Sequence, residues 1–405
     1  MVDGDKSTPA PAWLLDGPGA ILQLIRREPE GLTKLDIAHR TGISRTAVSQ
    51  RVDTLLGLGL LEVRSTAVFG RGRPAERFGL ARGRRVILVA DTGATGMRVA
   101  ACDATGEVLG EELLDIDITT GPIEVLTVMD HGFQRQMRAH GRTPADVIGI
   151  GIDVPGPVAH DTGRVVSPPI MTGWHEYDIP AAFRKRYGCS VIVEKDTNAM
   201  VLGEHVRALP DVENMVFVKI GTGIGTGLLI RGELYRGTDG AAGDIGHVSL
   251  TGRDDDGPLC RCGNRGCVEA YAGGWALARD LTEAGYAASS VSDVVNAVRG
   301  GNRTALSLVR HAGTILGTAI SDIVNMLNPA VVVVGGQLAA LDDILLATAR
   351  EAIYHRSLPL ATRNLRIVPS ALPDPGVHGL ARLVADTVFH PAAVDRMLLA
   401  PKDGD

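Results

Sequence analysis

The stretch MVFVKIGTGIGTG, residues 215–227, joins an apolar run to a turn made almost entirely of glycine and threonine. A stretch of similar design, VILVADTGAT, occupies residues 86–95. Small residues after a buried strand let backbone N–H groups approach a phosphate. The longer stretch is neither a Walker A loop nor a Rossmann fingerprint, because no Gly-Lys-Ser/Thr follows and the chain continues as a strand. The pair predicts two phosphate-binding turns, although the shorter stretch alone is equally compatible with a plain hairpin turn.

Both turns belong to an α/β pattern that begins at residue 86, where short apolar runs alternate with longer helical stretches. The longest helix is expected from Arg303 to Leu327, since the following Asn-Pro pair disfavours continuation. Strand-turn pairs in two successive lobes are typical of an actin-like, sugar-kinase-like fold. We therefore predict a two-lobed body over residues 82–405. Lobe 1 covers about residues 86–200 plus a C-terminal helix at 376–390, and lobe 2 covers about 201–375.

Residues 13–81 carry a different pattern, preceded by a flexible N-terminus at residues 1–12. The apolar spacing is helical between Pro18 and about Leu61, and its interruptions predict three helices. Thr33 and Ser44 stand at the expected N-cap positions. Two strand-like runs follow, joined by a loop rich in glycine and proline. This order predicts a winged helix-turn-helix.

The segment SRTAVSQRVDTLL, residues 44–56, is the predicted recognition helix. Its outward side chains suit base edges and phosphates: Ser44, Arg45, Thr46, Ser49, Gln50 and Arg51. Arg45 and Gln50 are the candidates for reading bases, and Arg51 for a phosphate contact. In the wing, Arg71 and Arg73 form an Arg-Gly-Arg-Pro sequence that resembles an AT-hook core, which enters the minor groove. The alternative is a helical bundle with a solvated polar face.

Charge is distributed unevenly along the chain. The net charge of −6 argues by itself against a nucleic-acid binder. However, the first 85 residues hold 14 Lys and Arg against 9 Asp and Glu, net +5, and the remaining 320 hold 27 against 38, net −11. A basic head on an acidic body is expected of a DNA-binding arm on an effector domain. Neither an apolar run of membrane length nor a signal-peptide pattern is visible, so we expect a cytoplasmic protein without membrane contact.

Three of the five cysteines are clustered, with a histidine upstream. Their spacing offers one imidazole and three thiolates to a closed, tetrahedral, structural zinc site: His247, Cys260, Cys262 and Cys267. Three unrelated surface thiols are the alternative. An odd number of cysteines fits a disulfide framework poorly, and Cys102 and Cys189 are expected to be buried without a function.

Asp196 follows an apolar run and begins a helical stretch. Its carboxylate could act as a general base toward a sugar hydroxyl. An N-cap aspartate is an equally good interpretation.

Together these motifs resemble the ROK family of repressors, open reading frames and sugar kinases over nearly the whole chain. The resemblance rests on DTGAT (91–95), EKDTNA (194–199), GTGIGTG (221–227), GDIGH (243–247) and CRCGNRGCVE (260–269). It implies that Asp196 matches the kinase base and that the zinc ligands are those named above. It implies a sugar-binding set of Lys195, Asp196, Asp244, His247 and Glu269. It implies a nucleotide-binding set of Asp91, Gly93, Thr95, Gly221, Thr222, Gly223, Gly225, Gly335 and Gly336.

Two positions depart from the pattern of the sugar-phosphorylating members. Lys195 stands where they usually carry Asn, and Asp244 stands where they usually carry Glu. An ammonium only donates hydrogen bonds, so it holds different hydroxyls from an amide, and we expect it to pair with Asp196 and weaken that base. The sugar pocket is therefore expected to be present but retuned.

The resemblance implies a sugar-responsive repressor of genes for carbohydrate uptake or metabolism. A homodimer or homotetramer would bind a palindromic double-stranded DNA operator, and a small sugar or sugar phosphate would shift the orientation of its DNA-binding heads. The alternative is an ATP-dependent sugar kinase, with Mg²⁺ and with Asp196 as general base. Activation in place of repression leaves no mark in the sequence.

Overall fold

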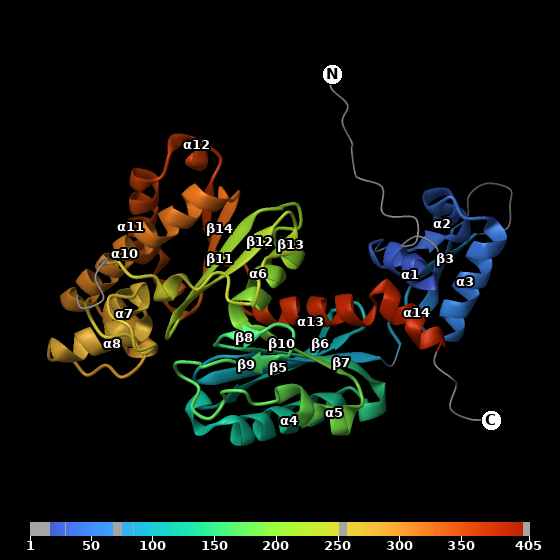
Figure 1. Cartoon of the computed structure of the whole chain (residues 1–405), viewed down its shortest axis with the longest axis horizontal. Coiled ribbons are helices and arrows are strands. Elements are labelled where there is room, and N and C mark those ends of the chain that lie inside the picture. Colours follow the sequence, from blue (N-terminus) through green and yellow to red (C-terminus); the bar gives the residue numbers. More distant parts are fainter. Residues whose placement is uncertain (1–16, 29, 68–74, 84, 251–256, 400–405) are drawn as a thin grey trace.

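The computed structural model describes residues 17–28, 30–67, 75–83, 85–250 and 257–399, which form a small head and a body of two lobes (Figure 1). The predicted flexible N-terminus (1–12) and the wing arginines Arg71 and Arg73 lie outside these residues. Within the described part of the chain, no helix is long and apolar enough to cross a membrane.

The head contains the three predicted helices and a three-stranded sheet of order β1-β3-β2. Thr33 caps α2 with a reciprocal capping box, and Ser44 caps α3 by accepting a hydrogen bond from the N–H of Ala47. The two N-cap predictions are therefore confirmed. The elements are α1 (Pro18–Arg26), β1 (Leu32–Thr33), α2 (Lys34–Thr41), α3 (Arg45–Gly57), β2 (Leu61–Ala67) and β3 (Ala75–Leu80).

Each lobe contains a five-stranded sheet, and the two sheets share one topology. The orders are β6-β5-β4-β7-β10 and β13-β12-β11-β14-β15. In both, the central strand pairs antiparallel with the next strand along the chain and parallel with a later one. The lobe 1 strands are β4 (Val86–Thr92), β5 (Gly96–Asp103), β6 (Val108–Asp115), β7 (Val147–Val154) and β10 (Ser190–Lys195). The lobe 2 strands are β11 (Met215–Ile220), β12 (Ile224–Ile230), β13 (Glu233–Leu234), β14 (Val331–Gly335) and β15 (Arg366–Pro369). The two small-residue turns therefore occupy equivalent places, between β4 and β5 and between β11 and β12.

Helices cover both faces of each sheet (Figure 1). In lobe 1, α4 (Pro122–Ala139) and α5 (Ile179–Tyr187) lie on one face, and the short pair β8 (Val158–Ala159) and β9 (Arg164–Val165) lies near β10. One face of the lobe 2 sheet packs against a layer of helices, which are α7 (Val268–Ala272), α8 (Gly274–Glu283), α9 (Val291–Arg299), α10 (Arg303–Leu327) and α11 (Asp342–Arg356). The short α12 (Pro359–Thr362) contacts α10. The longest helix has the predicted bounds.

Two helices, α6 (Asp196–Arg207) and α13 (Pro375–Val388), cover the remaining faces and cross each other at backbone contact. A Cβ on Gly203 would lie 1.8 Å from the carbonyl oxygen of Pro375, and a Cβ on Gly379 would lie 1.8 Å from that of Ala199. Helix α6 packs on the lobe 2 sheet and α13 on the lobe 1 sheet, so this crossing joins the lobes. The lobe boundary proposed at residue 200 falls inside α6.

The head is attached to the body through the C-terminal helices. Near the end of α13, Gln23 Nε2 donates a hydrogen bond of 2.7 Å to the carbonyl oxygen of Phe389, and Arg26 forms an ion pair with Asp386. Helix α14 (Pro391–Leu399) packs on α1, where the N–H of Gly19 donates to Asp395 over 3.0 Å. One apolar cluster contains residues of both the head and α13. No pattern in the sequence predicts this attachment.

Replacing Gly203 with alanine tests the crossing of α6 and α13. The added methyl group would overlap the Pro375 carbonyl, so the helices must separate, and we expect a loss of about 1–3 kcal/mol in the free energy of unfolding. Gly57→Ala is the control, because no atom lies within 4 Å of its Cβ position and alanine favours the helix. Denaturant unfolding of both variants checks this, and equal stability of the two would contradict the crossing.

Candidate functional site

A cavity of about 440 Å³ lies where the two lobes meet. Its wall includes the β4–β5 turn, the β11–β12 turn, the start of α6 and part of the loop at residues 257–267, called the cysteine loop below because it carries three cysteines. All five residues of the predicted sugar-binding set line it. Of the predicted nucleotide-binding set, only Gly335 is not among the lining residues. Gly335 instead lies against the ring of Phe217.

Several glycines of the predicted nucleotide-binding set make room for protein atoms, where the sequence suggested a phosphate. A Cβ on Gly223 would lie 2.4 Å from Glu269 Oε2. Gly336 has a φ of +92°, and a Cβ there would meet the backbone of Ile220. Gly221 is different, since its nearest neighbour would be the Lys219 side chain at 3.9 Å. Packing of the turns therefore accounts for part of their glycine content.

Lysines neutralise two carboxylates of the predicted sugar set. Lys195, which is buried, forms an ion pair with Asp244. The ammonium beside Asp196 comes from Lys219, with Nζ 2.6 Å from Oδ2. The expectation that Lys195 pairs with Asp196 is therefore wrong: Lys195, the last residue of β10, pairs with Asp244, and Lys219 within β11 pairs with Asp196. The N-cap alternative for Asp196 is also wrong, because Asp196 is the first residue of α6 and Lys195 occupies the N-cap position.

Two further carboxyl groups, those of Asp91 and Asp153, lie near the ion pair of Lys219 and Asp196. Burial raises the pKa of both, and their mutual repulsion contributes to the shift of Asp153. Burial alone would lower the pKa of the Lys219 ammonium, but attraction to Asp196 and Asp91 raises it overall. Asp153 accepts a 2.7 Å hydrogen bond from the N–H of Thr92. Sequence reasoning missed Lys219 and Asp153, although a single charge inside each apolar strand run was the signal.

Glu269 connects the β11–β12 turn to the start of α8. Its Oε2 accepts a 2.9 Å hydrogen bond from the N–H of Ile224, and its Oε1 accepts one of 3.2 Å from Trp275 Nε1. The backbone N–H of Trp275 donates a further hydrogen bond to the carbonyl oxygen of Thr222. Glu269 is buried in this network, so its position is fixed without a ligand.

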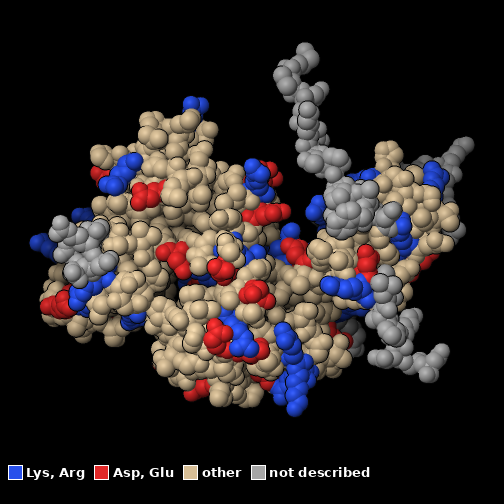
Figure 2. Space-filling view, viewed as in Figure 1, with Lys and Arg blue, Asp and Glu red and all other residues tan. Residues whose placement is uncertain are grey.

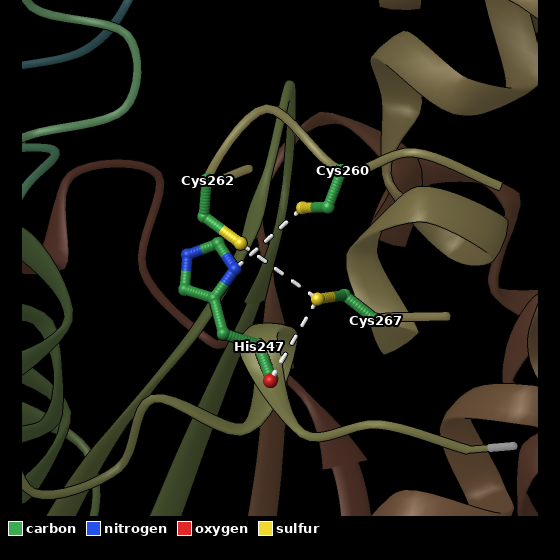
Figure 3. Close-up of side chains that lie close together, drawn as sticks. All are labelled: His247, Cys260, Cys262 and Cys267. Carbon is green, nitrogen blue, oxygen red and sulfur yellow. Dashed lines mark hydrogen bonds between the residues drawn. The ribbon is translucent and has the colours of Figure 1, made fainter. Parts of the chain in front are cut away.

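The four predicted metal ligands converge (Figure 3). Their ligand atoms all lie within 4.8 Å of one another. Cys260 Sγ is 3.7 Å from His247 Nδ1, and Cys262 Sγ is 3.8 Å from Cys267 Sγ. A tetrahedral zinc with Zn–S bonds of about 2.3 Å separates its sulfur ligands by about 3.8 Å, so these distances fit the ion.

Burial raises the pKa of the Cys260 thiol to about 12 and also raises that of Cys267. Neutral thiols do not ligate a metal, so binding an ion here must displace protons. His247 also lines the cavity, and Nε2 lies on the side of its ring away from the Cys260 contact (Figure 3). One side chain thus faces both the cysteine cluster and the cavity.

The predicted recognition helix is α3, and the side chains predicted to contact DNA differ in their exposure to solvent. Arg45, Thr46 and Gln50 are exposed, and blue Lys and Arg groups lie on the visible face of the head (Figure 2). Ser44 is exposed but caps the helix, and Arg51 is half-buried. Ser49 accepts a 2.9 Å hydrogen bond from Lys34, so its hydroxyl is engaged within the head.

Comparisons with known proteins agree with this architecture. Residues 87–387 match the ROK family, and residues 19–65 match the IclR helix-turn-helix domain. The xylose repressor of Bacillus subtilis (strain 168) is 28% identical over 355 residues, 86% of this chain and 89% of that protein. A glucokinase of Halalkalibacterium halodurans is 28% identical over 284 residues, 66% of this chain and 85% of the enzyme.

Among solved structures, a ROK family transcriptional regulator described as a homologue of the Escherichia coli MLC protein has the same fold. It superposes with a TM-score of 0.78 at 24% identity, covering 96% of this chain and all of the other. The family match runs from the first strand of the body to the end of α13 and thus covers most of the chain. This chain therefore belongs to the ROK family.

Proposed function

We propose that this protein is a sugar-responsive DNA-binding repressor of genes for carbohydrate uptake or metabolism. The observation that carries the proposal is that one helix, α13, contacts both the floor of the sugar cavity and the DNA-binding head. A Cβ on Gly376, near its start, would lie 2.5 Å from Asp91 Oδ2. Near its end lies the ion pair between Asp386 and Arg26 of α1. The similarity to a xylose repressor over 86% of the chain supports the same function.

Helix α13 connects the sugar cavity to the DNA-binding head and can transmit the effect of a bound sugar. A ligand shifts the head only if its affinity differs between DNA-competent and DNA-incompetent states. A sugar that changes the spacing of the lobes would move α6 against α13, since their backbones touch. The tight crossing converts that movement into a displacement of α1.

A homodimer on a palindromic operator is the proposed assembly, because one recognition helix reads only one half-site. The end of lobe 2 offers a surface for a second copy. Met326 is 80% exposed, and Leu358 and Leu360 are each 69% exposed. A hydrogen bond from the N–H of Leu358 to Asn325 joins the chain before α12 to the end of α10, so these exposed apolar side chains lie on neighbouring segments.

The lysine pairs argue against the kinase alternative, which the glucokinase similarity favours. A general base must take a proton from a sugar hydroxyl. The Asp196 carboxylate is already bound by Lys219 and by the N–H of Thr197 at 2.6 Å. Taking up a proton would neutralise Asp196 and leave the Lys219 ammonium, whose side chain is largely buried, without its counter-charge, which is unfavourable. The site is suited to holding a sugar without reacting with it.

We propose zinc for the cysteine cluster. Three thiolates and one imidazole form a closed set that leaves no open coordination position, which is typical of structural zinc. The ion would hold the loop that carries Arg261 and the side chain of His247 against the cavity.

DNA binding is tested on fragments from upstream of the protein's own gene. Arg45→Ala and Gln50→Ala should each weaken specific binding by about 1–3 kcal/mol, because each removes a base contact. Arg303→Ala removes an exposed arginine from the body and is the control. A mobility-shift titration measures the affinities, and a footprint should show two half-sites about 34 Å apart. Absence of any specific shift at physiological salt would overturn the proposal.

Zinc is tested by Cys262→Ser. Loss of one ligand should reduce the bound zinc measured by mass spectrometry and lower the melting temperature. Cys189→Ser should change neither, since Cys189 lies outside the cluster. Unchanged metal content in Cys262→Ser would show that the zinc assignment is wrong.

A repressor and a kinase respond differently to a sugar: a repressor changes its affinity for DNA, whereas a kinase phosphorylates the sugar. In an ADP-release assay with hexoses, N-acetylhexosamines and pentoses, we expect no turnover. A sugar that raises the melting temperature should also weaken the operator complex. Turnover that Asp196→Asn abolishes would establish the kinase. A stabilising sugar that leaves operator affinity unchanged would contradict the route through α13.

A further inference from the structure

Four cationic side chains line the cavity, and three of them are paired with carboxylates. Arg98 pairs with Glu111 at 2.6 Å, Lys195 with Asp244, and Lys219 with Asp196. The fourth is Arg261. Within the described ranges, no carboxylate lies within ion-pair distance of its guanidinium. Its contact is with the ring of Trp275, whose centroid is 4.8 Å from Arg261 Cζ.

Both the backbone and the side chain of Arg261 are held in place. Its backbone lies between two predicted metal ligands, Cys260 and Cys262. The loop is closed by a 2.8 Å hydrogen bond from the N–H of Cys260 to the carbonyl oxygen of Asn264. Trp275 is held by its hydrogen bond to Glu269 and by a second guanidinium, that of Arg279, at 5.2 Å.

A guanidinium stacked on an aromatic ring keeps its N–H donors free at its edge. Those donors match two oxygens of a phosphate or a carboxylate, in a charge-assisted bidentate pair. Three of the acids that line the cavity are already engaged, since lysines pair with Asp196 and Asp244 and both oxygens of Glu269 accept hydrogen bonds.

We propose that Arg261 determines effector specificity by binding an anionic group on the sugar, so that the effector is a phosphorylated or carboxylated sugar. His247 and Glu269, both in the predicted sugar-binding set, line the same cavity as Arg261, so a sugar bound by them would present its anionic group within that cavity. This inference rests on the proposed function, since it names the class of ligand for that cavity.

Calorimetric titration of the full-length, metal-loaded protein tests the inference with matched pairs of ligands. The probes are glucose, glucose 6-phosphate and glucuronate, together with N-acetylglucosamine and its 6-phosphate. At least one anionic member should bind about tenfold or more tightly than its neutral counterpart. Tighter binding of the 6-phosphates than of the neutral sugars would indicate a phosphate site, and tighter binding of glucuronate than of glucose would indicate a carboxylate site. Inorganic phosphate alone, against chloride at equal ionic strength, should raise the melting temperature.

Arg261→Gln should abolish the anion preference and the effect of phosphate, while zinc content stays the same because every metal ligand remains. Arg279→Gln is the matched control: it removes the other guanidinium on Trp275, which does not line the cavity, and should keep both effects. Equal affinity for neutral and anionic sugars, or an unchanged preference in Arg261→Gln, overturns the inference and leaves the proposed function standing. Failure of the proposed function would show separately, as absence of specific operator binding in the unchanged protein.

Discussion

The backbone contact between α6 and α13 is the constraint on which the rest of the structure depends. Glycine at positions 203 and 379 lets the two helices touch where any side chain would keep them apart. Because α6 belongs to the lobe 2 packing and α13 to that of lobe 1, the contact sets the separation of the lobes and the width of the cavity between them. Helix α13 also supports the head, so the same contact sets the position of α1.

Charge compensation is the second feature that shapes the cavity between the lobes. Carboxyl groups gather at its floor because both small-residue turns and the start of α6 meet there. Lys219 lies among them and has a raised pKa, so it stays charged and offsets their repulsion. The same ammonium pairs directly with the Asp196 carboxylate. The two substitutions noted in the sequence, Lys195 and Asp244, form their own pair and keep a second carboxylate from contributing an unpaired charge.

Local signals predicted much of this molecule. Helix caps at Thr33 and Ser44, the helix end at Asn328 and the spacing of the four candidate metal ligands depend on short-range geometry, which a single sequence displays. The partner of Asp196 depends on which lysine reaches it across two strands, and Lys195 was the nearer residue only in sequence. The attachment of α14 to α1 joins residues separated by 376 positions, as in the Gly19–Asp395 hydrogen bond, and no periodicity records such a contact.

The cysteine loop contributes Arg261 to the wall of the cavity and lies against His247, which lines the same cavity. Next to this loop, Glu269 joins Ile224 of the β11–β12 turn to Trp275, and a Cβ on Gly246 would lie 2.3 Å from the carbonyl oxygen of Ile224. Four protein ligands would leave a metal no position for a substrate. The ion's contribution would therefore be mechanical: it would fix the ring of His247 and the stacked guanidinium of Arg261 before a sugar arrives. A pre-positioned site loses less entropy on binding, so more of the interaction energy is available to shift the lobes.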